Sequence, residues 1–233
     1  MYESIIHPFS LLWWQITLTV LLIGSLMVAL SLFLSKKARR KLARNLGLFI
    51  LFDLIFFEFA IYYMGSWDIR YSLPIQYCAI MELCAGIGLI TRLQVVYEFT
   101  LFLGIIGPLQ AIIAPAIPFP GDYFFYDFYL SHAISIFTPI YLTVVESMRP
   151  RRHAWWKATL KFFVIALFVF YFDYLTGSNY MYLMEKPPLN HPLLKVGTWP
   201  SYLIIWLTAL FLWSYFVHLL FLVRQRLCSE RLE

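Results

Sequence analysis

Seven long apolar stretches occupy most of this chain and restrict its fold more than any other feature. They cover approximately residues 11–34, 46–64, 73–90, 95–114, 124–146, 156–174 and 200–223. A helix needs about 17 to 25 mostly apolar residues to cross a bilayer, so each stretch is long enough. A membrane β-barrel would instead show alternating segments of about ten residues. The pattern predicts an all-α polytopic membrane protein, a seven-transmembrane helix bundle that forms a single domain over residues 1–233.

The composition also indicates that lipid is the solvent of this chain. Hydrophobic residues make up 61% of it and charged residues only 13%, whereas soluble domains have about 25% charged residues. The net charge of +5 does not point to a nucleic-acid partner, because the basic residues gather at the ends of apolar stretches and not along one face.

The distribution of basic residues predicts the orientation in the membrane. All but three of the 18 Lys and Arg residues fall in the first, third and fifth connections or in the C-terminal tail, with a dense run over 36–44. The exceptions are Arg70, Lys186 and Lys195. Since cytoplasmic loops retain Lys and Arg, we expect the N-terminus outside and the C-terminus in the cytoplasm. The N-terminal segment lacks the basic region of a secretory signal, so the first stretch is expected to remain as a helix.

Polar side chains inside the predicted helices are the best candidates for function, because burying polarity in hydrocarbon is costly. On this topology a set from five helices lies in the outer half of the membrane: Glu58, Gln76, Cys78, Glu82, Gln110, Ser131, His132 and Asp173. Any single Gln or Ser in a membrane helix most often bonds a neighbouring helix. The set as a whole favours one cavity that opens to the outside.

Cys78 is the first candidate for chemistry within this set. It shares a helix face with Glu82 at a spacing of four residues, whereas Cys84 points in a different direction. The total of three cysteines provides no disulfide framework and no paired metal ligands. We interpret Cys84 and Cys228 as small packing residues.

His132 is the second candidate, because it lies at a depth comparable to Cys78 on the fifth predicted helix. A nearby imidazole can take the proton of a thiol and so turn it into a nucleophile. The sequence does not give the geometry between two helices, so a Cys78–His132 dyad is a hypothesis at this point.

Several other residues have structural interpretations. Glu98 lies close to Arg92 near the inner end of the fourth helix, and we expect an ion pair between them. Pro108 and Pro139 are expected to kink the fourth and fifth helices. The long external connection over 176–200 is rich in proline, and it fits a lid over a binding site or an exposed linker equally well.

Five short blocks resemble the pattern of the TMEM164/YwaF family of integral membrane proteins. They are LPIQYC at 73–78, YEF at 97–99, GPLQA at 107–111, LSH at 130–132 and GSNYM at 177–181. Their order and spacing match from the third helix to the start of the seventh, and the first two helices match only in character. The resemblance implies a membrane enzyme that moves fatty acyl chains between phospholipids and needs no metal or soluble cofactor. The similarity is greater to the bacterial branch, which implies a bacterial plasma membrane.

Carried onto this chain, the resemblance makes Cys78 the nucleophile and His132 its partner. The thiolate would attack a phospholipid ester, and a lysolipid hydroxyl would then collect the acyl group from the thioester. The family frequently has His where this chain has Gln76, so a second imidazole is missing here.

Supporting roles and the main alternative remain open. Candidate donors to a developing oxyanion are Gln76, Gln110 and Asn179, with Ser131 beside the histidine. Either Glu82 or Glu58 is a candidate to orient His132. Asn179 equally fits a lipid-headgroup contact or an ordinary turn residue. A related lipid hydrolase would use the same residues. The alternative from another class is a lipid or small-molecule transporter, binding protein or membrane partner subunit that uses the same cavity without covalent chemistry.

Overall fold

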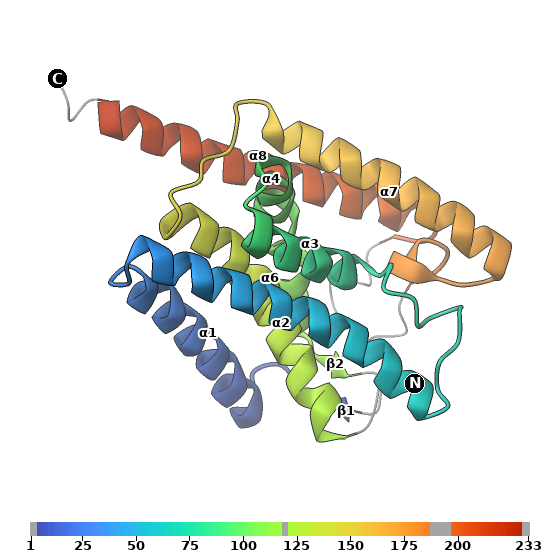
Figure 1. Cartoon of the computed structure of the whole chain (residues 1–233). Helices are drawn as coiled ribbons and strands as arrows, with labels where there is room; N and C mark the ends of the chain where they lie inside the picture. The colour runs from blue at the N-terminus through green and yellow to red at the C-terminus, as the bar shows by residue number, and fades with distance from the viewer. Residues whose placement is uncertain (1–3, 118–120, 187–196, 230–233) are drawn as a thin grey trace.

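The computed structural model describes residues 4–117, 121–186 and 197–229, and these are helical apart from one pair of very short strands. The helices are α1 (Leu11–Ser31), α2 (Lys36–Tyr63), α3 (Tyr77–Thr91), α4 (Gln94–Leu103), α5 (Ile106–Ile113), α6 (Asp122–Val144), α7 (Ala154–Thr176), the 3-10 turn η1 (Tyr180–Tyr182) and α8 (Ser201–Ser229). Strands β1 (Ser4–Ile5) and β2 (Ala116–Ile117) pair antiparallel. Figure 1 shows the helices as one bundle, with this strand pair at the end opposite the C-terminal end of α8.

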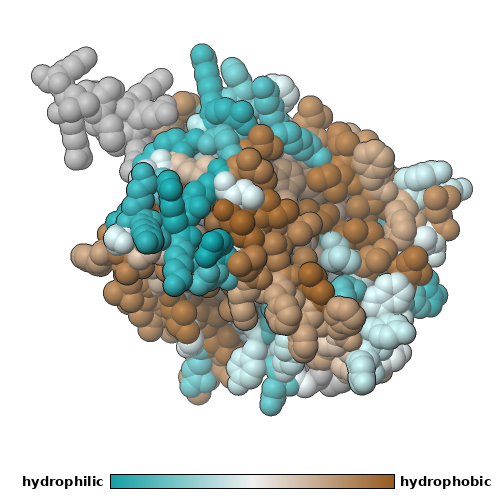
Figure 2. All heavy atoms as spheres, in the orientation of Figure 1, coloured by the Kyte–Doolittle hydropathy of each residue, from teal (hydrophilic) through white to brown (hydrophobic). Residues whose placement is uncertain are grey.

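The chain is a helical membrane protein. Within the described residues, five helical segments are long and apolar enough to cross a membrane: α1, α2, α4 together with α5, α7 and most of α8. Their outer faces are apolar and exposed, as at Leu22 and Phe168, and Figure 2 shows broad hydrophobic areas on the visible face. Soluble proteins rarely expose such large apolar areas, so this surface is suited to lipid.

The other two long helices, α3 and α6, lie inside the bundle. α3 packs against α2, α4 and α6, whereas α6 packs against α1, α3, α4 and α5. α3 has only 15 residues. α6 has 23 residues and runs through Pro139 as one helix, but it carries polar residues such as Asp127 and His132. These two helices therefore need not present a uniformly apolar surface to lipid.

Helix α2 begins ten residues earlier than predicted, at Lys36 instead of residue 46. The Ser35 hydroxyl caps it by accepting a hydrogen bond from the Ala38 amide at 3.3 Å. Lys, Arg, Leu and Ala are all good helix formers, so the basic run over 36–44 continues the helix instead of forming a loop. The first connection is consequently very short.

Helix α3 begins later than predicted, at Tyr77 instead of residue 73. Its N-cap residue Gln76 has an extended backbone with φ −64° and ψ 153°. Pro74 disfavours helical backbone at Leu73 before it, which opposes a helix that begins at residue 73. The later start places Cys78 in the first turn of α3.

The predicted fourth helix is divided into α4 and α5 around Gly104. Pro108 cannot donate a hydrogen bond to the Gly104 carbonyl, which explains the break and agrees with the predicted kink. The Tyr77 hydroxyl donates to the Leu103 carbonyl at this break, at 2.5 Å. A Cβ atom on Gly107 would lie 2.2 Å from the Tyr77 ring, so only glycine leaves room for it. The break thus fixes the start of α3 against α5.

Ion pairs join the helices at the end of the bundle where α7 begins. Glu98 accepts hydrogen bonds from Arg151, at 2.6 Å, and from Gln94, at 2.9 Å. Arg92 pairs instead with Glu146 at 3.0 Å. The predicted pair between Glu98 and Arg92 is therefore wrong, because the connection from α6 to α7 brings a second arginine to Glu98. We call these two contacts the inner-end ion pairs, after the orientation predicted from the basic residues.

Candidate functional site

A cavity of about 1140 Å³ lies on the far side of the bundle from the inner-end ion pairs. Its walls come from α2, α3, α5, α6, α7 and α8, and from η1 and residues 6–8. Most of the wall is apolar, with Phe162, Phe170 and Leu207 among the lining residues. Such a space can hold a lipid chain, and its few polar groups would fix the position of a reacting centre.

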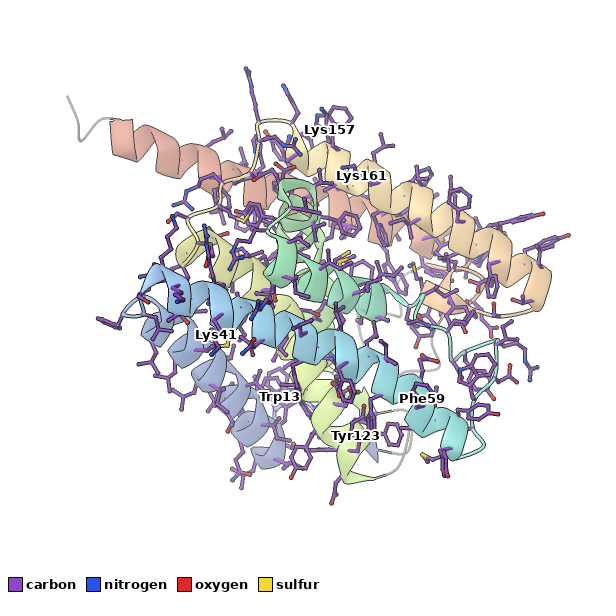
Figure 3. The ribbon with its side chains drawn as sticks, viewed as in Figure 1. Trp13, Lys41, Phe59, Tyr123, Lys157 and Lys161 are labelled. Atoms are coloured by element: carbon purple, nitrogen blue, oxygen red, sulfur yellow. The ribbon has the colours of Figure 1, made fainter. Side chains whose placement is uncertain are left out.

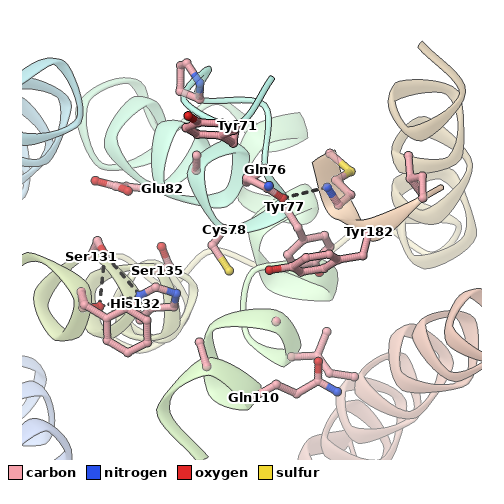
Figure 4. Close-up of a pocket in the computed structure, with 18 of the residues that line it drawn as sticks. Tyr71, Gln76, Tyr77, Cys78, Glu82, Gln110, Ser131, His132, Ser135 and Tyr182 are labelled. Carbon is pink, nitrogen blue, oxygen red and sulfur yellow. Dashed lines mark hydrogen bonds between the residues drawn. The ribbon is translucent and has the colours of Figure 1, made fainter. Parts of the chain in front are cut away.

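Seven of the eight polar residues expected in the outer half of the membrane line this cavity, and Figure 4 shows most of them. They are Glu58, Gln76, Cys78, Glu82, Gln110, Ser131 and His132. Asp173, which was expected at the same depth, is fully buried behind η1, where it accepts hydrogen bonds from Ser178 Oγ at 2.6 Å and the Tyr180 amide at 3.0 Å. It shapes the wall without entering the cavity.

Asn179 does not line the cavity. Its Oδ1 accepts hydrogen bonds from the amides of Met184, at 2.9 Å, and Glu185, at 3.2 Å. Its Nδ2 donates to the Glu185 carbonyl at 2.9 Å. Since both ends of the amide hold the loop after η1, the geometry agrees with the turn interpretation of Asn179, and its roles as an oxyanion donor or headgroup ligand stay predictions. Residues 187–196 of the predicted lid or linker lie outside the described residues.

Cys78 is the second residue of α3, and its sulfur projects into the cavity (Figure 4). The side chain of the N-cap residue, Gln76, makes no capping hydrogen bond to this helix. The first-turn amides of a helix have no partner within the helix, and its dipole is positive at this end. Both features stabilise negative charge on a nearby thiolate or on an oxyanion formed beside it.

His132 enters the same cavity from the α6 side (Figure 4). Its Nδ1 lies 2.5 Å from the Phe128 carbonyl oxygen and 3.3 Å from Ser131 Oγ. A carbonyl only accepts hydrogen bonds, so Nδ1 carries the proton in the neutral ring. Nε2 is then unprotonated and has the lone pair that a general base requires.

The carboxylates expected to orient His132 do not do so. Glu58 accepts a hydrogen bond from Trp67 Nε1 at 2.9 Å. Glu82 is buried, and its side chain points away from Cys78 and His132 in Figure 4. The backbone carbonyl one turn earlier on α6 orients the imidazole instead.

Gln76 joins η1 to the start of α3. Its Oε1 accepts a hydrogen bond from the Met181 amide at 2.7 Å, which holds η1 against the cavity. Its Nε2 donates to no group among the described residues and remains available as a donor beside Cys78. Gln110 lines the cavity from α5, on a different wall (Figure 4).

The sequence interpretation missed three polar residues at or behind the α6 wall. Asp127 and Ser135 line the cavity, and together with Ser131 they recur every four residues, which places them on one helix face. That spacing was readable in the sequence. Asp127 also interacts with Asp53 of α2, whose Oδ1 accepts a hydrogen bond from the Tyr123 hydroxyl at 3.3 Å.

Some of these buried polar atoms are unsatisfied. Oε1 of Glu82, Oδ2 of Asp53 and Oγ of Ser135 have no hydrogen-bond partner within the part of the chain that the structure describes. In the same part, no three His, Cys, Asp or Glu side chains are grouped to hold a metal ion. The polar groups are therefore available to each other, to water or to a ligand.

Together, the bundle and its cavity define a polytopic helical membrane protein that carries a cysteine and a histidine on the walls of one largely apolar chamber. A family model described as the TMEM164 family matches residues 5–218, nearly the whole chain. The chain therefore belongs to the TMEM164 family, which confirms the resemblance inferred from its sequence blocks. No curated protein and no solved structure was found to match it.

Proposed function

We propose that this protein is a membrane-embedded acyltransferase, which moves a fatty acyl chain between phospholipids through a thioester on Cys78. The observation that carries the proposal is that Cys78 and His132, from two different helices, line one apolar cavity. Membrane phospholipids are its partners, and the chemistry requires no soluble cofactor.

In the first half-reaction, Nε2 of His132 takes the proton from the Cys78 thiol. The thiolate attacks the ester carbonyl of a phospholipid whose acyl chain occupies the cavity. The carbon–oxygen bond to the glycerol breaks, and the departing alkoxide takes the proton back from His132 and leaves as a lysophospholipid. The acyl chain remains on Cys78 as a thioester.

In the second half-reaction, the hydroxyl of another lysophospholipid gives its proton to His132 and attacks the thioester. The carbon–sulfur bond breaks, a new ester forms, and the proton returns from His132 to Cys78. The first-turn amides of α3 and the Gln76 amide supply donors for the oxyanion in both steps. The Phe128 carbonyl keeps the imidazole oriented throughout.

The finer topology is part of the proposal. Seven spans result if α3 and α6, which lie within the bundle, are counted with the five long apolar segments. An odd number agrees with the position of β1 and the end of α8 at opposite ends of the bundle (Figure 1). With the basic connections in the cytoplasm, the N-terminus and the cavity face outward, in a bacterial plasma membrane. A lipid ester is then a more accessible acyl donor than cytoplasmic acyl-CoA.

The proposal is tested by trapping the thioester. The purified protein is incubated with a phospholipid that carries an alkyne-tagged acyl chain, and the tag is detected before and after hydroxylamine treatment. The expected result is a hydroxylamine-labile label on wild type and on Cys84→Ala, and none on Cys78→Ala. Labelling that persists unchanged in Cys78→Ala would exclude this mechanism.

A second candidate function is a lipid or small-molecule transporter or binding protein that uses the cavity without covalent chemistry. The volume of about 1140 Å³ and the mostly apolar wall of the cavity also suit a ligand that is bound without chemistry. A transporter should retain lipid binding and transfer between vesicles after Cys78→Ala. Full retention of that transfer, without any labelling of wild type, would favour this function over the acyltransferase.

A further inference from the structure

A second hollow, of about 520 Å³, lies between α4 and α7 near the inner-end ion pairs. Phe99 of α4 and the small residues Ala154 and Ala158 of α7 line its apolar part. Both alanines are buried, at 4% and 3% exposure. Because a methyl group fills little space, α7 leaves this hollow open beside the aromatic ring.

The rim of the hollow is basic. Arg152 lies just before α7, and Lys157 and Lys161 follow on α7 itself. The two lysines are four residues apart and therefore share one helix face. Figure 3 shows both on the starting half of α7. All three side chains belong to exposed residues, so their charged groups can reach a ligand at the rim.

The charge on this rim is not neutralised by the protein. Glu98 is the one carboxylate that lines the hollow, and Arg151 already pairs with it at 2.6 Å. No ion pair between the described residues involves Arg152, Lys157 or Lys161. Nζ of Lys157 lies over the ring of Trp156, 5.6 Å from the ring centroid. The hollow therefore offers at least three free positive charges above an apolar floor.

The position of the hollow indicates which anion it suits. It lies where a long apolar helix begins, which is the boundary between lipid tails and headgroups. A phosphate group would interact with the basic rim of the hollow, and a hydrocarbon chain would pack against Phe99 in its apolar part. Basic pockets between membrane helices on the cytoplasmic side are suited to anionic headgroups.

We propose that this hollow is a phosphate-binding site that takes the headgroup of an anionic phospholipid. The site lies at the opposite end of the bundle from Cys78, and it depends on no chemistry at that cysteine. The orientation given under Proposed function affects one point alone, which is that the lipid belongs to the inner leaflet.

The test measures lipid binding to the detergent-purified full chain. The probes are short-chain phosphatidylglycerol, short-chain phosphatidylcholine and inorganic phosphate, each titrated and followed by native mass spectrometry. We expect phosphatidylglycerol to bind more tightly than either of the others. Equal affinity for phosphatidylcholine would overturn the anionic specificity, and inorganic phosphate that binds as tightly as the lipid would overturn the lipid assignment.

Charge variants locate the site. Lys157→Gln/Lys161→Gln should weaken phosphatidylglycerol binding about 25-fold, from about 1 kcal/mol per basic side chain near the surface. The matched control is Lys36→Gln/Lys37→Gln, which removes the same charge from the start of α2, outside the hollow. Equal weakening in both double variants would overturn the proposal, since the effect would then come from net charge alone.

A steric variant keeps the test valid if the charge variant folds poorly. Ala158→Leu leaves every basic residue in place and fills part of the floor. It should also weaken binding of phosphatidylglycerol, at an unchanged elution volume in gel filtration. Wild-type affinity in a folded Ala158→Leu protein would show that the lipid does not enter the hollow.

Discussion

The two ends of this bundle differ in how their buried acidic side chains are paired. At the inner end, the buried carboxylate of Glu98 accepts hydrogen bonds from Arg151 and Gln94, and Glu146 pairs with Arg92. At the cavity, buried oxygens of Glu82 and Ser135 have no partner among the described residues. The carboxylates that join helices at the inner end are paired, although Nη2 of Arg92 has no partner among the described residues. The unpaired oxygens of Glu82 and Ser135 belong to residues that line a space able to receive a ligand.

The energetic difference between the two arrangements is substantial. An unsatisfied buried polar group costs about 1–3 kcal/mol. The hydrocarbon interior of a membrane supplies no water to satisfy such a group. At the inner end, direct pairs between helices and connections offset this cost for the carboxylates of Glu98 and Glu146. The cavity retains it, and a site that binds lipid or transfers a proton is the simplest reason for doing so.

The largest expected effect is on catalysis. Cys78→Ala should lower acyl transfer on the order of 10⁴-fold, because the nucleophile is lost, and should leave the melting temperature nearly unchanged. The measurement is acyl transfer between two phospholipids in proteoliposomes, beside thermal unfolding in detergent. Cys84→Ala is the matched control, and a similar loss of activity in both variants would break the distinction between site and structure.

The second effect is on stability and belongs to the inner end. Glu98→Ala should lower the free energy of unfolding by about 2–3 kcal/mol, because it leaves Arg151 and Gln94 without their acceptor. This value allows for the exposure of the Arg151 side chain, which is 61%. Thermal unfolding in detergent measures it. Acyl transfer by the folded fraction should not change, and a loss of turnover per folded molecule would mean that the inner end also serves the reaction.

A third prediction compares a paired and an unpaired hydroxyl on the same helix. Thr143 Oγ1 contacts the Tyr97 hydroxyl at 2.9 Å and donates to the Pro139 carbonyl at 2.7 Å, so Thr143→Val should cost about 1 kcal/mol. Ser135→Ala removes an unpaired hydroxyl and should leave stability unchanged or slightly higher. Denaturant-induced unfolding of the two variants measures the difference. Equal destabilisation would show that Ser135 is paired in the membrane.

The smallest effect is expected at the exposed ion pair between Asp68 and Arg70. Hydrogen bonds from Arg70 lower the pKa of Asp68 to about 2. A lowered folded-state pKa stabilises the fold above the unfolded value, about 3.9, and this contribution disappears as the pH falls toward 2. At pH 6, Asp68→Asn should therefore have a slightly lower melting temperature than wild type. This difference should shrink below pH 4. A difference that grows on acidification would contradict the assigned pair.

The sequence predicted the helical membrane fold because apolar length is a strong signal, and it failed where local chemistry competes with hydropathy. Lys and Arg favour helix as much as Leu does, so hydropathy could not find the true start of α2 at Lys36. Pro108 indicated the break in the fourth helix, since a missing N–H can be read directly from the sequence. The late start of α3 was less visible, because it depends on Gln76 being held extended by its contact with η1.

The depth of the candidate site residues in the membrane was predictable from the sequence, but the partners of their side chains were not. The predicted topology placed Cys78 and His132 at similar depth, and both line the cavity. The partners of Glu58 and Glu98 were not predictable, because Trp67 and Arg151 reach them through loops whose paths the sequence does not reveal. Asp127 was predictable, since it lies four residues before Ser131 and therefore on the same face of the helix.

The strand pair β1–β2 makes the two ends of the chain unequal for protein engineering. It fastens the segment before α1 to the connection before α6, and residues 6–8 directly after β1 line the cavity. A purification tag or fluorescent protein joined at the N-terminus would therefore pull on the chamber wall. The same tag joined after α8 would lie at the end of the bundle opposite the strand pair (Figure 1).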